Sequence, residues 1–121
     1  MSRLSIVRGD TKAFTLTLTD VDTGDPLLLT GLDLTFSVKY RLADTQEDAL
    51  IVKTSGDGIV VAGDPALGIA TLTLEPDDTN GLTNVRTLVW DVQVEDGLEV
   101  RTPLMGTFYL IGDVTTPAAP P

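Results

Sequence analysis

The stretch LDLTFSVKY, residues 32–40, alternates apolar and polar residues without a break. An alternation with a period of two is typical of a β-strand with one buried face and one face in water. The same alternation recurs in the segments 14–19, 70–74 and 88–95. The one helical signal is a single turn at 76–82, where acidic residues follow a proline. The sequence therefore predicts an all-β protein.

Turn signals rich in glycine, aspartate and proline separate these segments about every ten residues, a spacing typical of an antiparallel β-sandwich. An incomplete β-barrel is the alternative architecture. Trp90 and Phe36 are the largest residues of the expected core. We expect one β-sandwich domain at 1–112, followed by a proline-rich C-terminal arm at 113–121. The expected strands are 4–7, 12–20, 27–30, 32–41, 50–54, 59–62, 68–75, 85–95, 98–102 and 105–111.

The amino-acid composition excludes several classes of function. The 121 residues carry a formal charge of −10 and contain neither cysteine nor histidine. A thiolate nucleophile, a disulfide, and the commonest general base and transition-metal ligand are therefore absent. Acidic chains are repelled by phosphate backbones, and no apolar run is long enough to cross a bilayer. We expect no enzyme activity, no cofactor, no metal, no small-molecule substrate, and neither nucleic acid nor membrane as a partner.

The turn around Gly97 allows a finer prediction. A three-residue loop at 95–97 would pair Val94 with Leu98 and Val92 with Val100, which keeps apolar residues on one face. A two-residue loop would mix the two faces. We therefore expect the longer loop, with Gly97 in the left-handed conformation.

Two acidic segments are candidate sites. Asp20, Asp22 and Asp25 resemble the start of a calcium loop, but the glycine falls one position early and Gly31 stands where a bidentate glutamate is needed. These three aspartates are kept as weak metal candidates, and a solvated hairpin loop is the favoured interpretation. The carboxylates at 75–78 are expected in a turn or a one-turn helix.

The candidate interface residues are an aromatic side chain and the two chain ends. Phe108 and Tyr109 are adjacent, so in a strand one of the two must point outward. An exposed aromatic residue is typical of protein interfaces. The interface candidates are Ser2, Arg3, Tyr109, Pro117, Pro120 and Pro121.

The order of the motifs is familiar over residues 3–112. They include LSIVRGDTK at 4–12, FTLTL at 14–18, PLLLTG at 26–31, LTFSVK at 34–39, GIATLTLEPDDT at 68–79 and VWDVQV at 89–94. This chain resembles the small immunoglobulin-like structural proteins of tailed bacteriophages and is similar to the N-terminal domain of baseplate upper proteins. The resemblance implies an immunoglobulin-like β-sandwich, no catalytic residues, and attachment to tails, baseplates or fibres.

The resemblance also implies that the partners are other phage structural proteins in a symmetric assembly. The protein would be made in the cytoplasm of the host bacterium and end in the virion. Longer relatives continue into fibre or receptor-binding parts, whereas this chain stops after one domain, which favours an adaptor that docks through edge strands and termini. A head decoration or neck protein is the alternative. A carbohydrate- or calcium-binding module is the alternative of another class.

Overall fold

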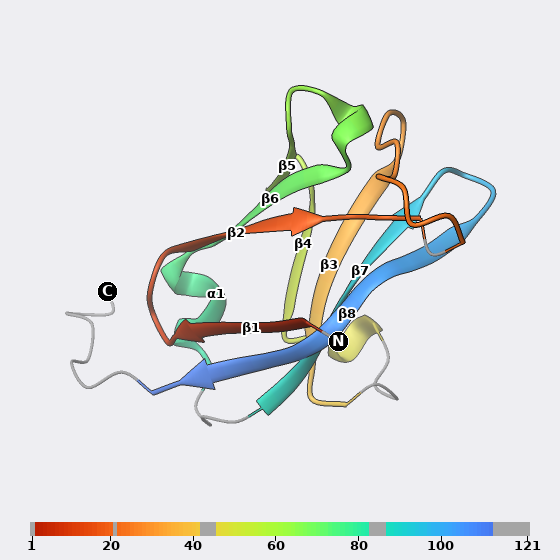
Figure 1. The fold of residues 1–121 in the computed structure, drawn as a ribbon. Helices are drawn as coiled ribbons and strands as arrows, with labels where there is room; N and C mark the ends of the chain where they lie inside the picture. The colour runs from red at the N-terminus through yellow and green to blue at the C-terminus, as the bar shows by residue number, and fades with distance from the viewer. Residues whose placement is uncertain (1, 21, 42–45, 83–86, 113–121) are drawn as a thin grey trace.

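The fold is seen in a computed structural model of the chain, which describes residues 2–20, 22–41, 46–82 and 87–112 (Figure 1). Pro117, Pro120 and Pro121 lie outside the described residues. The strands are β1 (Ser2–Val7), β2 (Lys12–Thr17), β3 (Asp33–Lys39), β4 (Ile51–Ser55), β5 (Gly58–Val61), β6 (Ile69–Leu74), β7 (Thr87–Glu95) and β8 (Val100–Ile111). The helical turns are η1 (Gln46–Asp48), η2 (Pro65–Leu67) and α1 (Pro76–Asn80).

The eight strands of the described residues belong to one sheet, in the order β1-β8-β7-β3-β4-β5-β6-β2. The sheet curls until its two edge strands, β1 and β2, approach each other, so that it is nearly closed into a barrel (Figure 1). The expected all-β class is therefore confirmed. The architecture is the incomplete barrel, since the pairing does not divide into the two sheets of a sandwich. The pairing is also not purely antiparallel, because β1 runs parallel to β8 and β4 runs parallel to β5.

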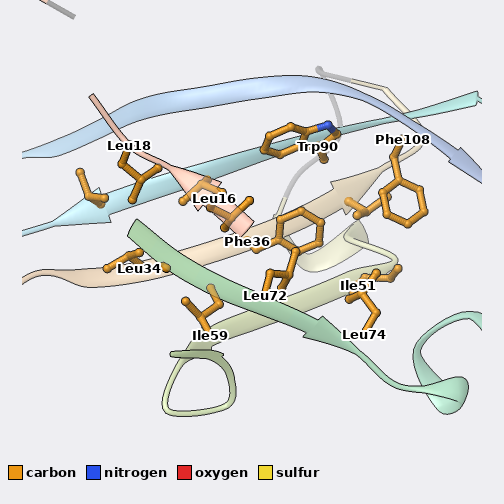
Figure 2. Close-up of a cluster of buried hydrophobic side chains, with 14 of the residues drawn as sticks. Leu16, Leu18, Leu34, Phe36, Ile51, Ile59, Leu72, Leu74, Trp90 and Phe108 are labelled. Carbon is orange, nitrogen blue, oxygen red and sulfur yellow. The ribbon is translucent and has the colours of Figure 1, made fainter. Parts of the chain in front are cut away.

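The core fills the inside of this curled sheet. The alternation in the sequence explains which residues belong to the core. In β3 the inward side chains of Leu34, Phe36 and Val38 are fully buried, while Asp33 and Lys39 remain accessible. The rings of Phe36 and Trp90 lie 5.9 Å apart between centroids and are tilted by 35°. Figure 2 shows leucine and isoleucine side chains from β2, β3, β4, β5 and β6 converging on these rings. Trp90 and Phe36 are thus core residues, as expected.

The strand expected at 27–30 does not form. Leu27 and Leu29 are buried, which explains why the segment alternates, but their main-chain N–H groups donate to two different parts of the chain. The Leu27 N–H donates to the carbonyl of Leu18, and the Leu29 N–H donates to that of Pro65. A ladder needs successive bonds to one strand. The segment therefore packs onto the core as irregular structure.

The hairpin register around Gly97 also differs from the prediction. Glu95 pairs with Val100 and Val94 pairs with Arg101, so the loop is Asp96–Glu99 rather than 95–97. The Asp96 carboxylate accepts hydrogen bonds at 2.8 Å from the N–H groups of both Leu98 and Glu99, which stabilises the longer loop. Leu98, predicted to face the core, is 94% exposed. The left-handed conformation of Gly97 is confirmed by its φ of 94°.

A β-bulge then restores the alternation farther along β8. Val92 pairs with Leu104 while Val94 pairs with Arg101, so β8 contains one residue more than β7 across this interval. The interval contains Pro103, which has no N–H to donate to a ladder. Beyond the bulge, Phe108 and Leu110 point into the core.

The helical turn α1 follows β6, and the sequence prediction of a one-turn helix is confirmed. The main-chain N–H of Glu75 donates to Asp78 at 2.7 Å, which caps the turn. The β1–β2 turn packs against it, because the Gly9 N–H donates to the buried Thr79 hydroxyl at 2.8 Å. In the described residues no helix is long and apolar enough to cross a membrane.

Candidate functional site

The outer face of β8 exposes a row of large apolar side chains. Met105, Tyr109 and Ile111 are each 39% exposed and share one face, because they lie an even number of residues apart. The neighbouring strands add half-buried Val7, opposite Ile111, and Val89, opposite Thr107. We call Val7, Val89, Met105, Tyr109 and Ile111 the outer patch. Exposed apolar residues that adjoin across strands are typical of interaction surfaces.

The structure brings two of the sequence candidates together on this patch. The Arg3 guanidinium carbon lies over the Tyr109 ring, 4.5 Å from its centroid. Arg3 is on β1, paired with Thr107, so it reaches Tyr109 diagonally across the strands. The contact fixes the orientation of the Arg3 guanidinium relative to the Tyr109 ring. Arginine and tyrosine are both typical of the centres of protein interfaces. Ser2, the third described candidate, pairs with Gly106 at the start of β1.

The outer patch is bordered on β7 by a carboxylate in an unusual environment. Asp91 pairs with Met105, and partial burial raises the pKa of its carboxyl above the ordinary 3.8. Lys39 on β3 opposes this effect, because its positive charge favours the ionised form. At its border on β7, the outer patch therefore adjoins a partly desolvated carboxylate.

A second feature lies between the edge strands β1 and β2. A pocket of about 220 Å³ is lined by side chains of β1, β2, β7 and β8: Leu4, Thr15, Leu16, Thr17, Trp90 and Leu104. We call this pocket and the two free edges beside it the β1/β2 gap. The Trp90 side chain is buried, and its Nε1–H has no hydrogen-bond acceptor among the described residues. Buried donors without partners are rare in folded proteins.

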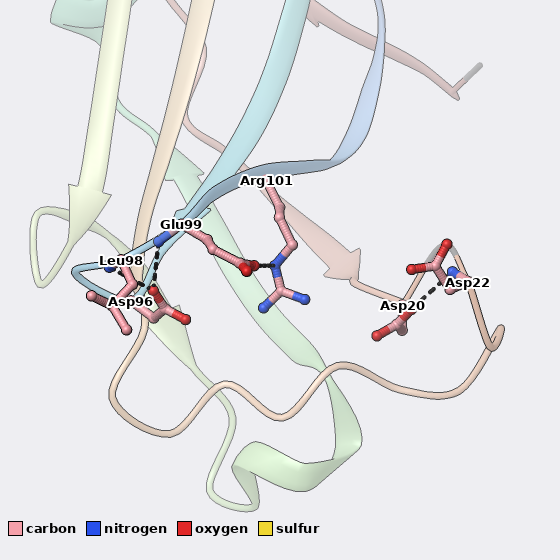
Figure 3. Close-up of polar contacts among 6 residues, drawn as sticks. All are labelled: Asp20, Asp22, Asp96, Leu98, Glu99 and Arg101. Carbon is pink, nitrogen blue, oxygen red and sulfur yellow. Dashed lines mark hydrogen bonds and ion pairs between the residues drawn. The ribbon is translucent and has the colours of Figure 1, made fainter.

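The acidic loop holds the candidate metal residues in a hydrogen-bonded turn. One oxygen of Asp20 accepts a hydrogen bond from the N–H group of Asp22 at 2.8 Å (Figure 3). The same oxygen accepts a second bond from the N–H group of Thr23 at 3.3 Å. The main chain closes the same loop, since the Asp20 N–H donates to the carbonyl of Asp25 at 2.8 Å. In the described parts of the chain, no three histidine, cysteine or acidic residues are grouped so that they could hold a metal ion. The loop is thus organised by its own backbone.

A pocket next to this loop had no sequence signal. It measures about 200 Å³ and lies between the loop and the β7–β8 hairpin, lined by Thr19, Asp20, Asp22, Leu27, Val94, Arg101, Thr102 and Pro103. Figure 3 shows the Arg101 side chain between the Asp96–Glu99 turn and the acidic loop. Its Nε lies 4.0 Å from an oxygen of Glu99, and both side chains are well exposed. The pocket depends on the bulged β8 register, which explains why sequence reasoning missed it.

The carboxylates at 75–78 form a structural cluster. Asp78 accepts the helix-capping bond through one oxygen and pairs through the other with the Lys53 ammonium at 2.9 Å. The pair joins β4 to α1, and both side chains are largely buried. Asp78 thus connects the helical turn to the sheet.

Comparison of the sequence with known protein families matches no family model, and no curated protein is significantly similar to it.

Proposed function

We propose that this protein is a non-enzymatic structural component of a tailed phage virion. In this role it is an adaptor of the tail, baseplate or fibre that docks onto other structural proteins through its edge strands and termini. The resemblance of the ordered motifs at 4–94 to immunoglobulin-like phage proteins motivates the phage assignment.

The observation that supports a docking role best is the outer patch. It combines apolar side chains with the Arg3–Tyr109 stack on the edge strand β1 and its neighbour β8. A surface of this kind fits a protein partner, because burial of the apolar residues and the oriented cation would both add to binding. The acidic loops stand apart from the patch, at the Asp20 loop and the Asp96 turn, where charge keeps a strand-rich protein soluble.

The test is incorporation into particles. Particles are purified from a lysate of the bacterium that carries the coding sequence, and the protein is sought by mass spectrometry and by antibody labelling in electron microscopy. We expect a constant ratio to tail proteins and labelling of the tail or its tip. Absence from the particles would refute the proposal, and labelling of the head or neck would replace it with the head decoration or neck assignment.

A matched pair of variants connects incorporation to the outer patch. Particles lacking the protein are complemented with Tyr109→Lys or with Val60→Lys. Val60 is 67% exposed on β5 and lies outside the patch, so it controls for the added charge. We expect Tyr109→Lys to reduce incorporation and Val60→Lys to leave it unchanged. Equal incorporation of both variants would show that the patch is not the docking surface.

A further inference from the structure

The β1/β2 gap is the place where the curled sheet is not closed. β1 and β2 are the two ends of the sheet order, and no pairing joins them among the described residues. Figure 1 shows the two strands diverging from the short turn that connects them. Edge strands present unpaired N–H and C=O groups, and two edges that face each other offer a place for a strand between them.

The alternation of the two strands identifies the groups that face the gap. In a strand, residues whose side chains point inward direct their main-chain groups to one neighbour, and the intervening residues direct theirs to the other side. The Leu18 N–H donates to Gly68 on the β6 side, which assigns the even positions of β2 to β6. The main-chain groups of Thr15 and Thr17 therefore face the gap. On β1, Ser5 faces it as well, because its carbonyl accepts the Lys12 ammonium at 2.8 Å.

Lys12 thus occupies one end of the gap, next to the turn, where its ammonium is the partner of the Ser5 carbonyl. The pocket lies farther along, between Leu4 on one edge and the segment Thr15–Thr17 on the other. Its floor consists of the core side chains Leu16 and Trp90 and of Leu104, which is partly buried and packs against the core. An extended segment placed here would pair with both edges and cover this floor with an apolar side chain.

The charges around the gap indicate the kind of segment that fits. Lys12 places its ammonium at one end of the gap, on the Ser5 carbonyl, and the first nineteen residues, which contain both edge strands, carry three cations and one acid, although the whole chain carries −10. Cations on edge strands discourage pairing with basic or neutral strands and favour an acidic one. A second copy of this chain would bring the same ammonium to the gap on its own edge strand.

We propose that the β1/β2 gap binds an extended acidic segment of a partner protein, in which apolar residues alternate with glutamate or aspartate, as an added strand that completes the barrel. This inference deepens the proposed docking role and rests on it for the nature of the partner. Trp90 reports on the site, because it is the single tryptophan of the chain and lines the pocket.

The experiment uses the purified full chain and a synthetic peptide of about eight residues in which valine and glutamate alternate, with blocked ends. Binding is followed by Trp90 fluorescence and by hydrogen exchange of individual amides. We expect a saturable fluorescence change and slower exchange of the Ser5 and Thr15 amides. A peptide with lysine in place of glutamate should bind about tenfold more weakly. A peptide with proline at alternate positions should not bind, because it lacks the N–H groups needed for one edge.

Two variants at one position separate strand pairing from side-chain effects. Thr15→Pro removes an N–H that faces the gap and that the folded chain does not use in its sheet, whereas Thr15→Val keeps it. Both should unfold at nearly the same denaturant concentration as the parent, which shows that the fold is intact. We expect Thr15→Pro to abolish peptide binding and Thr15→Val to retain it.

Several outcomes would overturn the inference. They are the absence of a saturable Trp90 change at millimolar peptide, equal binding of the proline peptide, and protection on β8 instead of β1 and β2. A Trp90 change that appears on concentrating the protein alone, together with a dimer in sedimentation, would assign the gap to a second copy. Peptide binding without incorporation into particles would refute the phage role and leave the gap as a strand-binding site.

Discussion

Arg3 lies over the ring of Tyr109, 4.5 Å from its centroid, although the two residues stand at opposite ends of the described chain. The contact exists because β1, the first strand, pairs in parallel with β8, the last. It therefore orients a cation on an edge strand and fixes the ring that dominates the outer patch.

We expect a measurable coupling between these two side chains. Arg3→Met and Tyr109→Val remove the cation and the ring separately while keeping an apolar body at each position. In a double-mutant cycle the free energies of unfolding should show a coupling of about 0.5 kcal/mol, as is usual for an exposed cation–π pair. Urea denaturation of the four proteins measures this quantity. Strictly additive effects would show that the stack contributes nothing to the fold.

Two glycines with positive φ should differ sharply in their tolerance of alanine. Gly97 has a φ of 94° and open space where a Cβ would stand, so Gly97→Ala should destabilise by about 1 kcal/mol through backbone strain alone. Gly68 has a φ of 68°, and a Cβ there would lie 2.5 Å from the carbonyl oxygen of Leu18. Gly68→Ala should therefore destabilise by about 3 kcal/mol. Equal denaturant midpoints for the two variants would contradict this distinction.

The hairpin register makes a further prediction at Leu98. Because this side chain is almost fully exposed, Leu98→Ser should change the free energy of unfolding by less than about 0.5 kcal/mol. Val94→Ala is the comparison, since Val94 is buried and its truncation should destabilise by about 2 kcal/mol. In the register expected from the sequence, Leu98 would face the core beside Val94. A large loss of stability in Leu98→Ser would support that register instead.

The alternation in the sequence identifies which residues face the core, but it does not identify their partners. It correctly assigns Phe36 and Trp90 to the core, because side-chain direction is a local property of a strand. It misassigns the hairpin, because the Asp96 carboxylate stabilises a longer loop and the bulge near Pro103 then restores the alternation. Buried residues at 27–30 likewise suggested a strand that has no ladder.

The candidate surface can be predicted only in part, because the alternation does not identify which strands pair. The sequence indicates Tyr109 as one of two adjacent aromatic residues, of which one must point outward, and Arg3 by its place at the chain end. Their contact depends on the β1–β8 pairing, which joins residues more than a hundred positions apart. The gap depends on which strands end up at the sheet edges, and no local pattern encodes that order.

The ion pair between Lys53 and Asp78 should contribute more to stability than the pair between Arg101 and Glu99. The first spans 2.9 Å, and its side chains are 14% and 17% exposed, so Lys53→Met would leave a largely buried carboxylate without its cation. We expect a loss of about 2 kcal/mol. Arg101→Met breaks an exposed contact of 4.0 Å and should change stability by less than about 0.5 kcal/mol. Similar losses in the two variants, measured by thermal or urea unfolding, would contradict this order.

Two aspartates should affect the pH dependence of stability in opposite directions. Burial raises the pKa of Asp91, so its ionised form destabilises the folded state at neutral pH, and this penalty is relieved as the pH falls through the folded pKa toward 3.8. Asp91→Asn should therefore be more stable than the parent at neutral pH, with a gain that shrinks in acid.

Hydrogen bonds from the N–H groups of Glu99 and Leu98 lower the pKa of Asp96. Its stabilisation is complete above 3.8 and is lost as the pH falls through the lower folded pKa. Asp96→Asn should be less stable than the parent at neutral pH and approach it in strong acid. Urea unfolding over a pH series measures both, and a lower stability of Asp91→Asn at neutral pH would mean that attraction to Lys39 outweighs the burial of Asp91.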